Sequence, residues 1–333
     1  MTTAMHALGF HRFGGPEVLE YLTVPVPPLR PGHVLLRPEA IGLNFADVYR
    51  RRGHYHLAGE PPYVLGYEAA GTIAAVAPDV TGFRVGQRVA VADVPHANAE
   101  WVLAPATHLI AVPDAVSSPQ AAAVLLQGLT AQYLATDSYP VGPGTLAVVH
   151  AAAGGVGQLL TQYVKLRGGT VVGLTSTADK AAVAWAAVAW AAGADAVLHY
   201  ADDWVAAVRA WRPGDRAGAD VVYDSVGSTL PQSLQAARRG GGAVVFYGMA
   251  GGNPAPVDPR HLMDESKTLT GGDLWRYLTT PEERRRRAAR LFALLTSGQL
   301  RVNISRTFAL HDGAAAHRYL ESRQSTGKIL LLP

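Results

Sequence analysis

The segment that constrains the fold most is glycine-rich and reads His150-Ala151-Ala152-Ala153-Gly154-Gly155-Val156-Gly157. The apolar run 146–150 predicts a buried strand before it, and residues 155–166 have the pattern of a helix. A strand that turns through glycines into a helix is typical of a pyrophosphate-binding β–α unit. Gly154 would let the backbone approach the phosphates, Gly157 would let the helix pack closely on the sheet, and the helix N-terminus would supply partial positive charge.

The chain after this loop continues to alternate between strands and helices. Three further buried strands are predicted at 171–174, 220–224 and 242–246, with a helix over 178–192. Strands that alternate with helices predict a parallel, doubly wound sheet.

The first third of the chain has a different pattern. Short strands predicted at 34–38, 70–76 and 86–91 are separated by proline and glycine turns, which indicates an antiparallel, β-rich domain. The apolar end at 327–332 predicts a strand that returns to this domain. A length of 333 residues suits two domains, and we therefore predict an α/β protein whose first domain is discontinuous.

The composition excludes several classes of chemistry. Because the chain has no cysteine, it cannot form disulfides, thiolate-ligated metal sites or a cysteine nucleophile. The net charge of +3 is too small to favour a nucleic-acid partner. The one basic cluster, Arg284–Arg287 with Arg290, predicts a solvated helix face. No signal peptide or bilayer-spanning run is evident, so a cytoplasmic protein without a membrane partner is expected.

The end of the second predicted strand indicates which dinucleotide would bind. NAD sites usually have a carboxylate there for the ribose diol, whereas this chain reads Leu174-Thr175-Ser176-Thr177-Ala178-Asp179-Lys180. Ser176 and Lys180 could donate to a 2′-phosphate, which a carboxylate at the strand end would repel. The sequence therefore favours NADPH over NADH.

Motifs along nearly the whole chain resemble those of the zinc-independent medium-chain reductases of the quinone oxidoreductase, or ζ-crystallin-like, type. Besides the glycine-rich loop, the matching segments are Ala40-Ile41-Gly42-Leu43-Asn44-Phe45-Ala46-Asp47-Val48-Tyr49, Gly66-Tyr67-Glu68-Ala69-Ala70-Gly71, Leu126-Gln127-Gly128-Leu129-Thr130-Ala131, Tyr223-Asp224-Ser225-Val226-Gly227 and Leu320-Glu321-Ser322-Arg323. The resemblance implies a GroES-like catalytic domain (1–124 and 268–333) and a Rossmann-type NADPH-binding domain (125–267). Zinc dehydrogenases carry a cysteine near Asn44 and a histidine where this chain has Tyr67, so no metal is expected.

The resemblance also assigns residues to a site. Those implied at the nicotinamide end are Asn44, Phe45, Asp47 and Tyr49. Those implied along the rest of the cofactor are Thr130, Tyr133, Gly154, Gly155, Val156, Gly157, Ser176, Lys180, Tyr200, Ser225, Phe246, Tyr247, Gly248, Met249 and Arg323. The place of Tyr200 depends on a tandem repeat, because residues 181–185 recur at once as 186–190. Catalytic roles are expected for Asn44, Tyr49 and Tyr55.

The chemistry favours an acceptor that needs no metal. Quinones and enones hold the developing negative charge by conjugation, whereas alcohols and ordinary ketones need stronger polarisation. The main hypothesis is an NADPH-dependent quinone reductase, and the alternative is an enal, enone or enoyl-thioester reductase with Tyr55 as proton donor. Tyr55 could equally be a pocket-wall tyrosine. A non-enzymatic, crystallin-like NADPH-binding protein is the third hypothesis, and the resemblance implies a homodimer.

Overall fold

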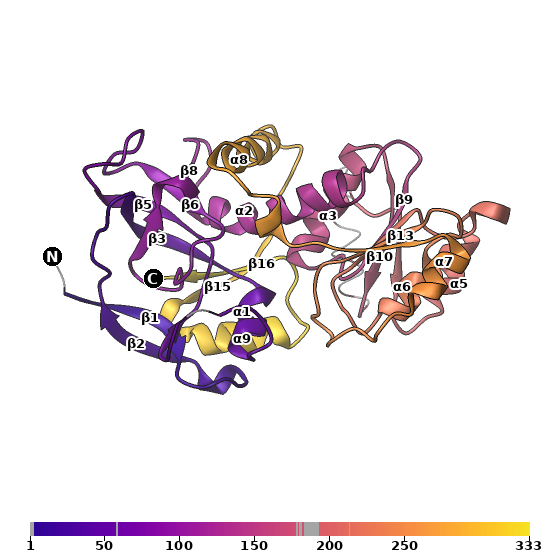
Figure 1. Ribbon diagram of the computed structural model, residues 1–333, viewed down its shortest axis with the longest axis horizontal. Helices are drawn as coiled ribbons and strands as arrows, with labels where there is room; N and C mark the ends of the chain where they lie inside the picture. The colour runs from indigo at the N-terminus through magenta and orange to yellow at the C-terminus, as the bar shows by residue number, and fades with distance from the viewer. Residues whose placement is uncertain (1–2, 58, 178, 180–181, 183–192, 213) are drawn as a thin grey trace. The chain divides into compact units, whose positions relative to one another are not determined.

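The computed structural model describes residues 3–57, 59–177, 179, 182, 193–212 and 214–333 (Figure 1). The chain forms two compact units. One comprises Met1–Leu129, Leu278–Gly298 and Val302–Pro333, and the other comprises Thr130–Tyr277 and Gln299–Arg301. Lys180, all of the tandem repeat except Ala182, and most of the helix predicted over 178–192 lie outside the described residues.

The second unit is built on a six-stranded parallel sheet in the order β11-β10-β9-β12-β13-β14. Its strands are β9 (Leu146–Val149), β10 (Thr170–Thr175), β11 (Ala196–His199), β12 (Val221–Asp224), β13 (Ala243–Phe246) and β14 (Thr268–Gly271). The order reverses between β9 and β12, which is the switch point of a doubly wound sheet. The predicted α/β fold is therefore confirmed.

Helices cover both faces of this sheet, because its strands are apolar on both sides. They are α3 (Gly155–Leu166), α5 (Trp204–Ala210), α6 (Leu230–Ala236) and α7 (Pro259–Glu265). In Figure 1, α3 lies on one side of β9 and β10, with α5 and α6 on the other. Leu146 and Val148 pack with Trp204, Val208 and Leu230 in one buried cluster. The helix predicted over 155–166 is confirmed.

The first unit is β-rich, as the sequence predicts. A three-stranded sheet has the order β2-β1-β4, and a seven-stranded sheet has the order β15-β16-β3-β5-β6-β8 with β7 also paired to β3. The strands are β1 (Ala4–Phe10), β2 (Glu20–Pro25), β3 (His33–Leu43), β4 (Tyr63–Val64), β5 (Ala69–Val76), β6 (Arg88–Val91), β7 (Val102–Pro105), β8 (Ile110–Ala111), β15 (Ile304–Ala309) and β16 (Lys328–Leu332). The helices are α1 (Phe45–Arg51), α8 (Pro281–Thr296), α9 (Gly313–Glu321) and most of α2 (Ser118–Tyr133), whose residues from Thr130 on belong to the second unit.

The C-terminal strand returns to this unit, as predicted. β16 pairs antiparallel with β3, with Ile329 opposite Leu43 and Leu331 opposite Ile41. These side chains belong to one core cluster and are almost completely buried. The pairing brings Lys328, the first residue of β16, next to the end of β3 and the start of α1.

Two features differ from the sequence prediction. β14, which the prediction groups with the first domain, pairs in parallel with β13 and stands last in the order of the six-stranded sheet. On α8, Arg284 and Arg287 are buried rather than solvated, since Arg284 pairs with Asp93 and Arg287 with Glu283. None of the helices in the described part of the chain combines the length and hydrophobicity needed for a bilayer span.

Candidate active site

In the second unit, the predicted cofactor residues gather at the carboxyl edge of the parallel sheet. Strands β9, β10, β12 and β13 end in register, with Tyr223 opposite Val149 and Asp224 opposite Phe246. The segments that follow them are therefore neighbours, as the backbone hydrogen bonds from Ala152 to Leu174 and from Tyr247 to Asp224 show. Ligands of doubly wound sheets bind at this edge, beside the switch point.

The glycine-rich loop forms a cradle at the start of α3. The loop turns through a hydrogen bond from Gly154 N–H to Ala151 O (2.8 Å), and Gln158 N–H bonds to Gly154 O (2.9 Å). The preceding N–H groups in the first turn therefore point out of the helix N-terminus, where they can hold a phosphate. A Cβ at Gly157 would lie 2.2 Å from Ala151 O, so only glycine allows this close approach.

A chain of hydrogen bonds lies beneath this cradle. The Tyr200 hydroxyl accepts from Ala151 N–H (3.0 Å) and lies 3.2 Å from His150 Nδ1. His150 Nε2 lies 3.1 Å from Ser233 Oγ, which donates to Asp224 Oδ2 at 2.6 Å. Because Ser233 donates to the carboxylate, it accepts from His150 Nε2–H, and Nδ1 accepts from Tyr200. These hydrogen bonds link the end of β12 to the first residues of the glycine-rich loop.

The protonation states agree with these directions. Burial lowers the pKa of His150 to about 4, although Asp224 opposes the shift, so the imidazole is neutral. Burial raises the pKa of the Tyr200 phenol, which therefore keeps its proton. Burial alone would raise the pKa of Asp224, but the Ser233 hydroxyl and two backbone N–H groups donate to its carboxylate and the pKa is lowered. The Asp224 carboxylate is therefore the final acceptor in this series of hydrogen bonds.

The remaining cofactor residues predicted in this unit occupy different environments. Ser176 is exposed just after β10, whereas Thr130 and Tyr133 are buried. The Tyr133 ring stacks on Tyr277 with centroids 4.3 Å apart. Ser225 follows β12 directly, and its carbonyl accepts from Ala250 N–H. The partly buried residues Phe246, Tyr247, Gly248 and Met249 continue along the sheet edge at the end of β13.

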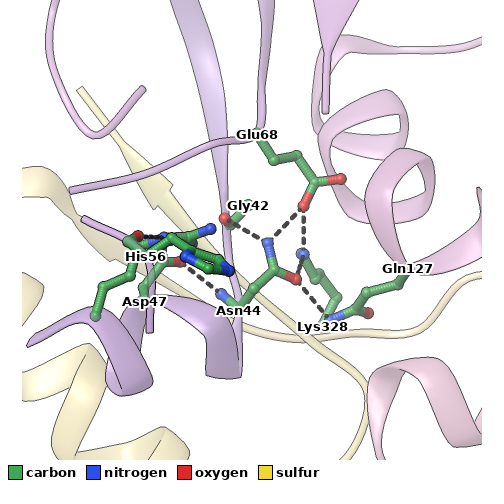
Figure 2. A network of polar contacts seen from close by, with 8 residues as sticks. Gly42, Asn44, Asp47, His56, Glu68, Gln127 and Lys328 are labelled. Atoms are coloured by element: carbon green, nitrogen blue, oxygen red, sulfur yellow. Dashed lines mark hydrogen bonds and ion pairs between the residues drawn. The ribbon is translucent and has the colours of Figure 1, made fainter. Parts of the chain in front are cut away.

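In the first unit, Asn44 is the residue before α1 and sits in a buried polar network (Figure 2). Its Nδ2 donates to Gly42 O (3.1 Å) and to Glu68 Oε2 (2.9 Å). Its Oδ1 accepts from Gln127 Nε2 (3.2 Å) and from Lys328 Nζ (2.8 Å). The side-chain amide thus uses both protons and both lone pairs within the protein.

Asp47 and Arg50 fix the first turns of α1. Asp47 Oδ2 accepts from Asn44 N–H (3.0 Å), and Asp47 Oδ1 lies 3.7 Å from the Arg50 guanidinium. Burial raises the pKa of Asp47, against the opposing effects of Arg50 and the Asn44 N–H. The Arg50 guanidinium also lies over the Tyr67 ring, 3.6 Å from its centroid, and 5.1 Å from that of Tyr55. Asp47 therefore faces the protein in this structure and holds the start of α1.

The aromatic residues predicted near the nicotinamide lie together along α1 and the turn after it. The Tyr49 ring is 6.2 Å from that of Phe45 and meets the Tyr55 ring edge-on at 6.4 Å. All three are partly buried. Arg323 is exposed just past α9, in the left-handed backbone region with φ 62°. Within the described residues, no group of three His, Asp or Glu side chains could hold a metal ion.

Sequence reasoning missed the partners of these residues. Neither His150 nor Ser233 was assigned a role, and Lys328 and Glu68 were not expected to meet Asn44. A signal was available for Glu68 and for Lys328: Glu68 is a single carboxylate within an apolar segment, and Lys328 is one of few lysines and opens an apolar strand. Unpaired charges are almost never fully buried, so such positions predict a partner elsewhere in the fold.

Comparisons with known proteins place the chain in a family. Residues 30–145 match the model of the alcohol dehydrogenase GroES-like domain, and residues 192–331 match that of zinc-binding dehydrogenases. The chain is 38% identical to a quinone oxidoreductase of Pseudomonas aeruginosa, over 97% of this chain and 98% of the relative. The chain belongs to the zinc-independent medium-chain reductases of the quinone oxidoreductase family. The family and the GroES-like and Rossmann-type architecture expected from the sequence are thereby confirmed.

Two further family members are similar over nearly their whole length. The 2-haloacrylate reductase of a Burkholderia species is 38% identical, with 97% of each chain covered. A mycobacterial protein solved in complex with NADPH is 41% identical and superposes with a TM-score of 0.92, over 99% of this chain and 100% of that one. The fold that carries both site regions is thus shared with these two relatives.

Proposed function

We propose that this chain is an NADPH-dependent quinone reductase. The observation that carries the proposal is the cradle at 150–157, at the carboxyl edge of the sheet, next to a strand end with the Ser176 hydroxyl in place of a carboxylate. The cradle suits a pyrophosphate, and the hydroxyl suits a 2′-phosphate. The family supports the same conclusion, since its members include the Pseudomonas quinone oxidoreductase and the mycobacterial NADPH complex.

The proposed roles follow from where the described residues lie, and the role of Lys180 follows from the sequence alone. The N–H groups of Gly155 and Val156 would hold the pyrophosphate, and Ser176 with Lys180 would bind the 2′-phosphate. Asn44 and Tyr49, at the start of α1, would line the nicotinamide end. NADPH would supply a hydride, and a quinone delocalises the resulting charge without a metal. Solvent can then protonate the product, so quinone reduction needs no dedicated acid.

Two measurements test this proposal: the rate of NADPH oxidation and the dissociation constants of the two cofactors. Purified protein is mixed with NADPH and simple benzoquinones or naphthoquinones, and loss of nicotinamide absorbance is followed. We expect rapid oxidation of NADPH and a dissociation constant for NADPH at least about tenfold below that for NADH, because a 2′-phosphate gains charge-assisted hydrogen bonds. Tight NADPH binding without turnover of any acceptor would favour the non-enzymatic hypothesis. Equal affinity for NADH would refute the cofactor proposal.

Alkene reduction is the alternative activity, and the similarity to a 2-haloacrylate reductase favours it specifically. An alkene needs a proton after the hydride, and the partly buried Tyr55 hydroxyl in the turn after α1 is the candidate donor. We predict that Tyr55→Phe lowers the kcat for an enone or acrylate by about 100-fold, which is the usual size of general-acid catalysis, and changes quinone reduction little.

The matched control for this prediction is Tyr63→Phe, a partly buried tyrosine that packs against Phe10 in the same unit. It should leave both activities unchanged. Equal losses on alkene and quinone in Tyr55→Phe would remove Tyr55 from the acid role.

We also propose that the chain forms a homodimer through the six-stranded sheet. β14 stands last in the strand order of this sheet, and an edge strand can pair with a second copy. Light scattering that shows a monomer at micromolar concentration would refute this. The expected cytoplasmic location and the predicted domain boundaries stay predictions.

A further inference from the structure

Glu68 and Lys328 form an ion pair with no solvent contact. Both side chains are completely buried, and Lys328 Nζ lies 2.6 Å from Glu68 Oε2. The other carboxylate oxygen accepts from Leu126 N–H at 2.6 Å. Burying two charges is costly, and a hydrophobic pair of similar size is often as stable. Stability alone therefore does not account for an ion pair at this position.

Each charge of the pair contacts one end of the Asn44 amide (Figure 2). The Glu68 carboxylate can only accept and binds Asn44 Nδ2, whereas the Lys328 ammonium can only donate and binds Asn44 Oδ1. A flipped amide would place oxygen against the carboxylate and NH₂ against the ammonium. The two charges thus permit a single orientation of the amide.

The backbone at Gly42 approaches the Glu68 carboxylate closely. A Cβ on Gly42 would lie 2.2 Å from Glu68 Oε2, so the carboxylate rests directly against the end of β3. Asn44 is two residues further along, immediately before α1, and its N–H is capped by Asp47. An amide locked at this point also fixes the direction in which α1 leaves the sheet.

We infer that the Glu68–Lys328 ion pair is a positioning device for Asn44 and for the start of α1. The inference rests on the proposed function, in which Asn44 and Tyr49 line the nicotinamide end. Neither Glu68 nor Lys328 needs to touch the cofactor. The pair keeps the acceptor and donor atoms of Asn44 in one arrangement throughout turnover.

The test uses the double variant Glu68→Gln/Lys328→Met, which removes both charges together. Lys328→Met alone would leave a buried, unpaired carboxylate and is liable to unfold. We expect the double variant to fold and to bind NADPH with a similar Kd. Its Tm should be somewhat lower, because a glutamine keeps only one of the two acceptor oxygens that Leu126 N–H and Asn44 Nδ2 use. Its kcat for quinone should fall about tenfold or more, because a small displacement of the residues around the reacting atoms lowers the rate strongly.

A second readout is independent of turnover. The Asn44 side-chain amide protons are identified by NMR through their loss in Asn44→Ser, and their hydrogen exchange is measured. Exchange should be at least about tenfold faster in the double variant, because neither end of the amide is held by a charge. The control Lys267→Met removes another nearly buried lysine, paired with Glu265, and should change neither kcat nor this exchange.

The outcomes separate the two proposals. Unchanged kcat with unchanged Asn44 exchange in the double variant would show that the pair is only structural and would overturn the inference. If the parent protein oxidises no NADPH with any quinone, the proposed function fails. The exchange rate of the Asn44 amide then still decides whether the ion pair positions this residue.

Discussion

Replacing Gly157 by alanine is expected to weaken NADPH binding by roughly 10- to 100-fold, because overpacking a close contact costs about 1–3 kcal/mol. The added Cβ would lie 2.2 Å from Ala151 O and 2.8 Å from Ala152 Cα. Both are backbone atoms, which cannot rotate away as a flexible side chain could. We therefore expect the loop backbone to shift.

The displaced loop would also strain the hydrogen bonds beneath it. Ala151 N–H is held by Tyr200, which in turn contacts His150. Isothermal titration with NADPH measures the loss in affinity, and circular dichroism checks that the sheet remains folded. Gly142→Ala is the matched control, because a Cβ there meets no atom within 4 Å. A Kd for Gly157→Ala within about threefold of the parent value would mean that the loop does not need this close approach.

The individual strands and helices could be predicted from the sequence because they depend on the pattern of neighbouring residues. The glycine loop between β9 and α3 is set by neighbouring residues, and the predicted helix at 155–166 has the bounds that the structure shows. The strands predicted at 70–76 and 327–332 each differ from β5 and β16 by one residue at the start, for the same reason. Apolar runs bounded by glycine and proline define such elements without reference to the rest of the chain.

The side-chain partners could not be predicted, because they depend on contacts between distant segments. Lys328 binds Asn44 across 284 positions of sequence, and His150 meets Ser233 across 83. A lysine that opens an apolar strand signals a buried charge but does not say which carboxylate receives it. Arg284 shows the opposite error. Its basic sequence neighbours predict a solvated cluster, but the fold places Asp93 beside it and buries the ion pair.

Acidification is expected to destabilise the chain strongly, through two buried histidines. Burial lowers the pKa of His150 to about 4, and burial together with Arg51 lowers the pKa of His317 to about 3. His317 Nδ1 lies 2.9 Å from the Arg51 guanidinium, so the ring is a neutral acceptor. The unfolded chain protonates both near pH 6.5, whereas the folded chain does not. The stability from these groups is therefore complete above pH 6.5 and is lost as the pH falls toward 4.

The size of this effect can be measured by urea unfolding at about pH 7.5 and about pH 5. At the lower pH, keeping the two histidines neutral lowers the free energy of unfolding by up to about 4 kcal/mol in all. The total free energy of unfolding of a typical domain is about 5–15 kcal/mol. His317→Gln should lose about half of the difference between the two pH values, because it removes one of the two groups that take up protons on unfolding. His261→Gln, an exposed histidine on α7, should keep the whole difference. If His317→Gln and His261→Gln show the same pH dependence, His317 does not remain neutral in the folded protein, and carboxylates must account for the acid sensitivity.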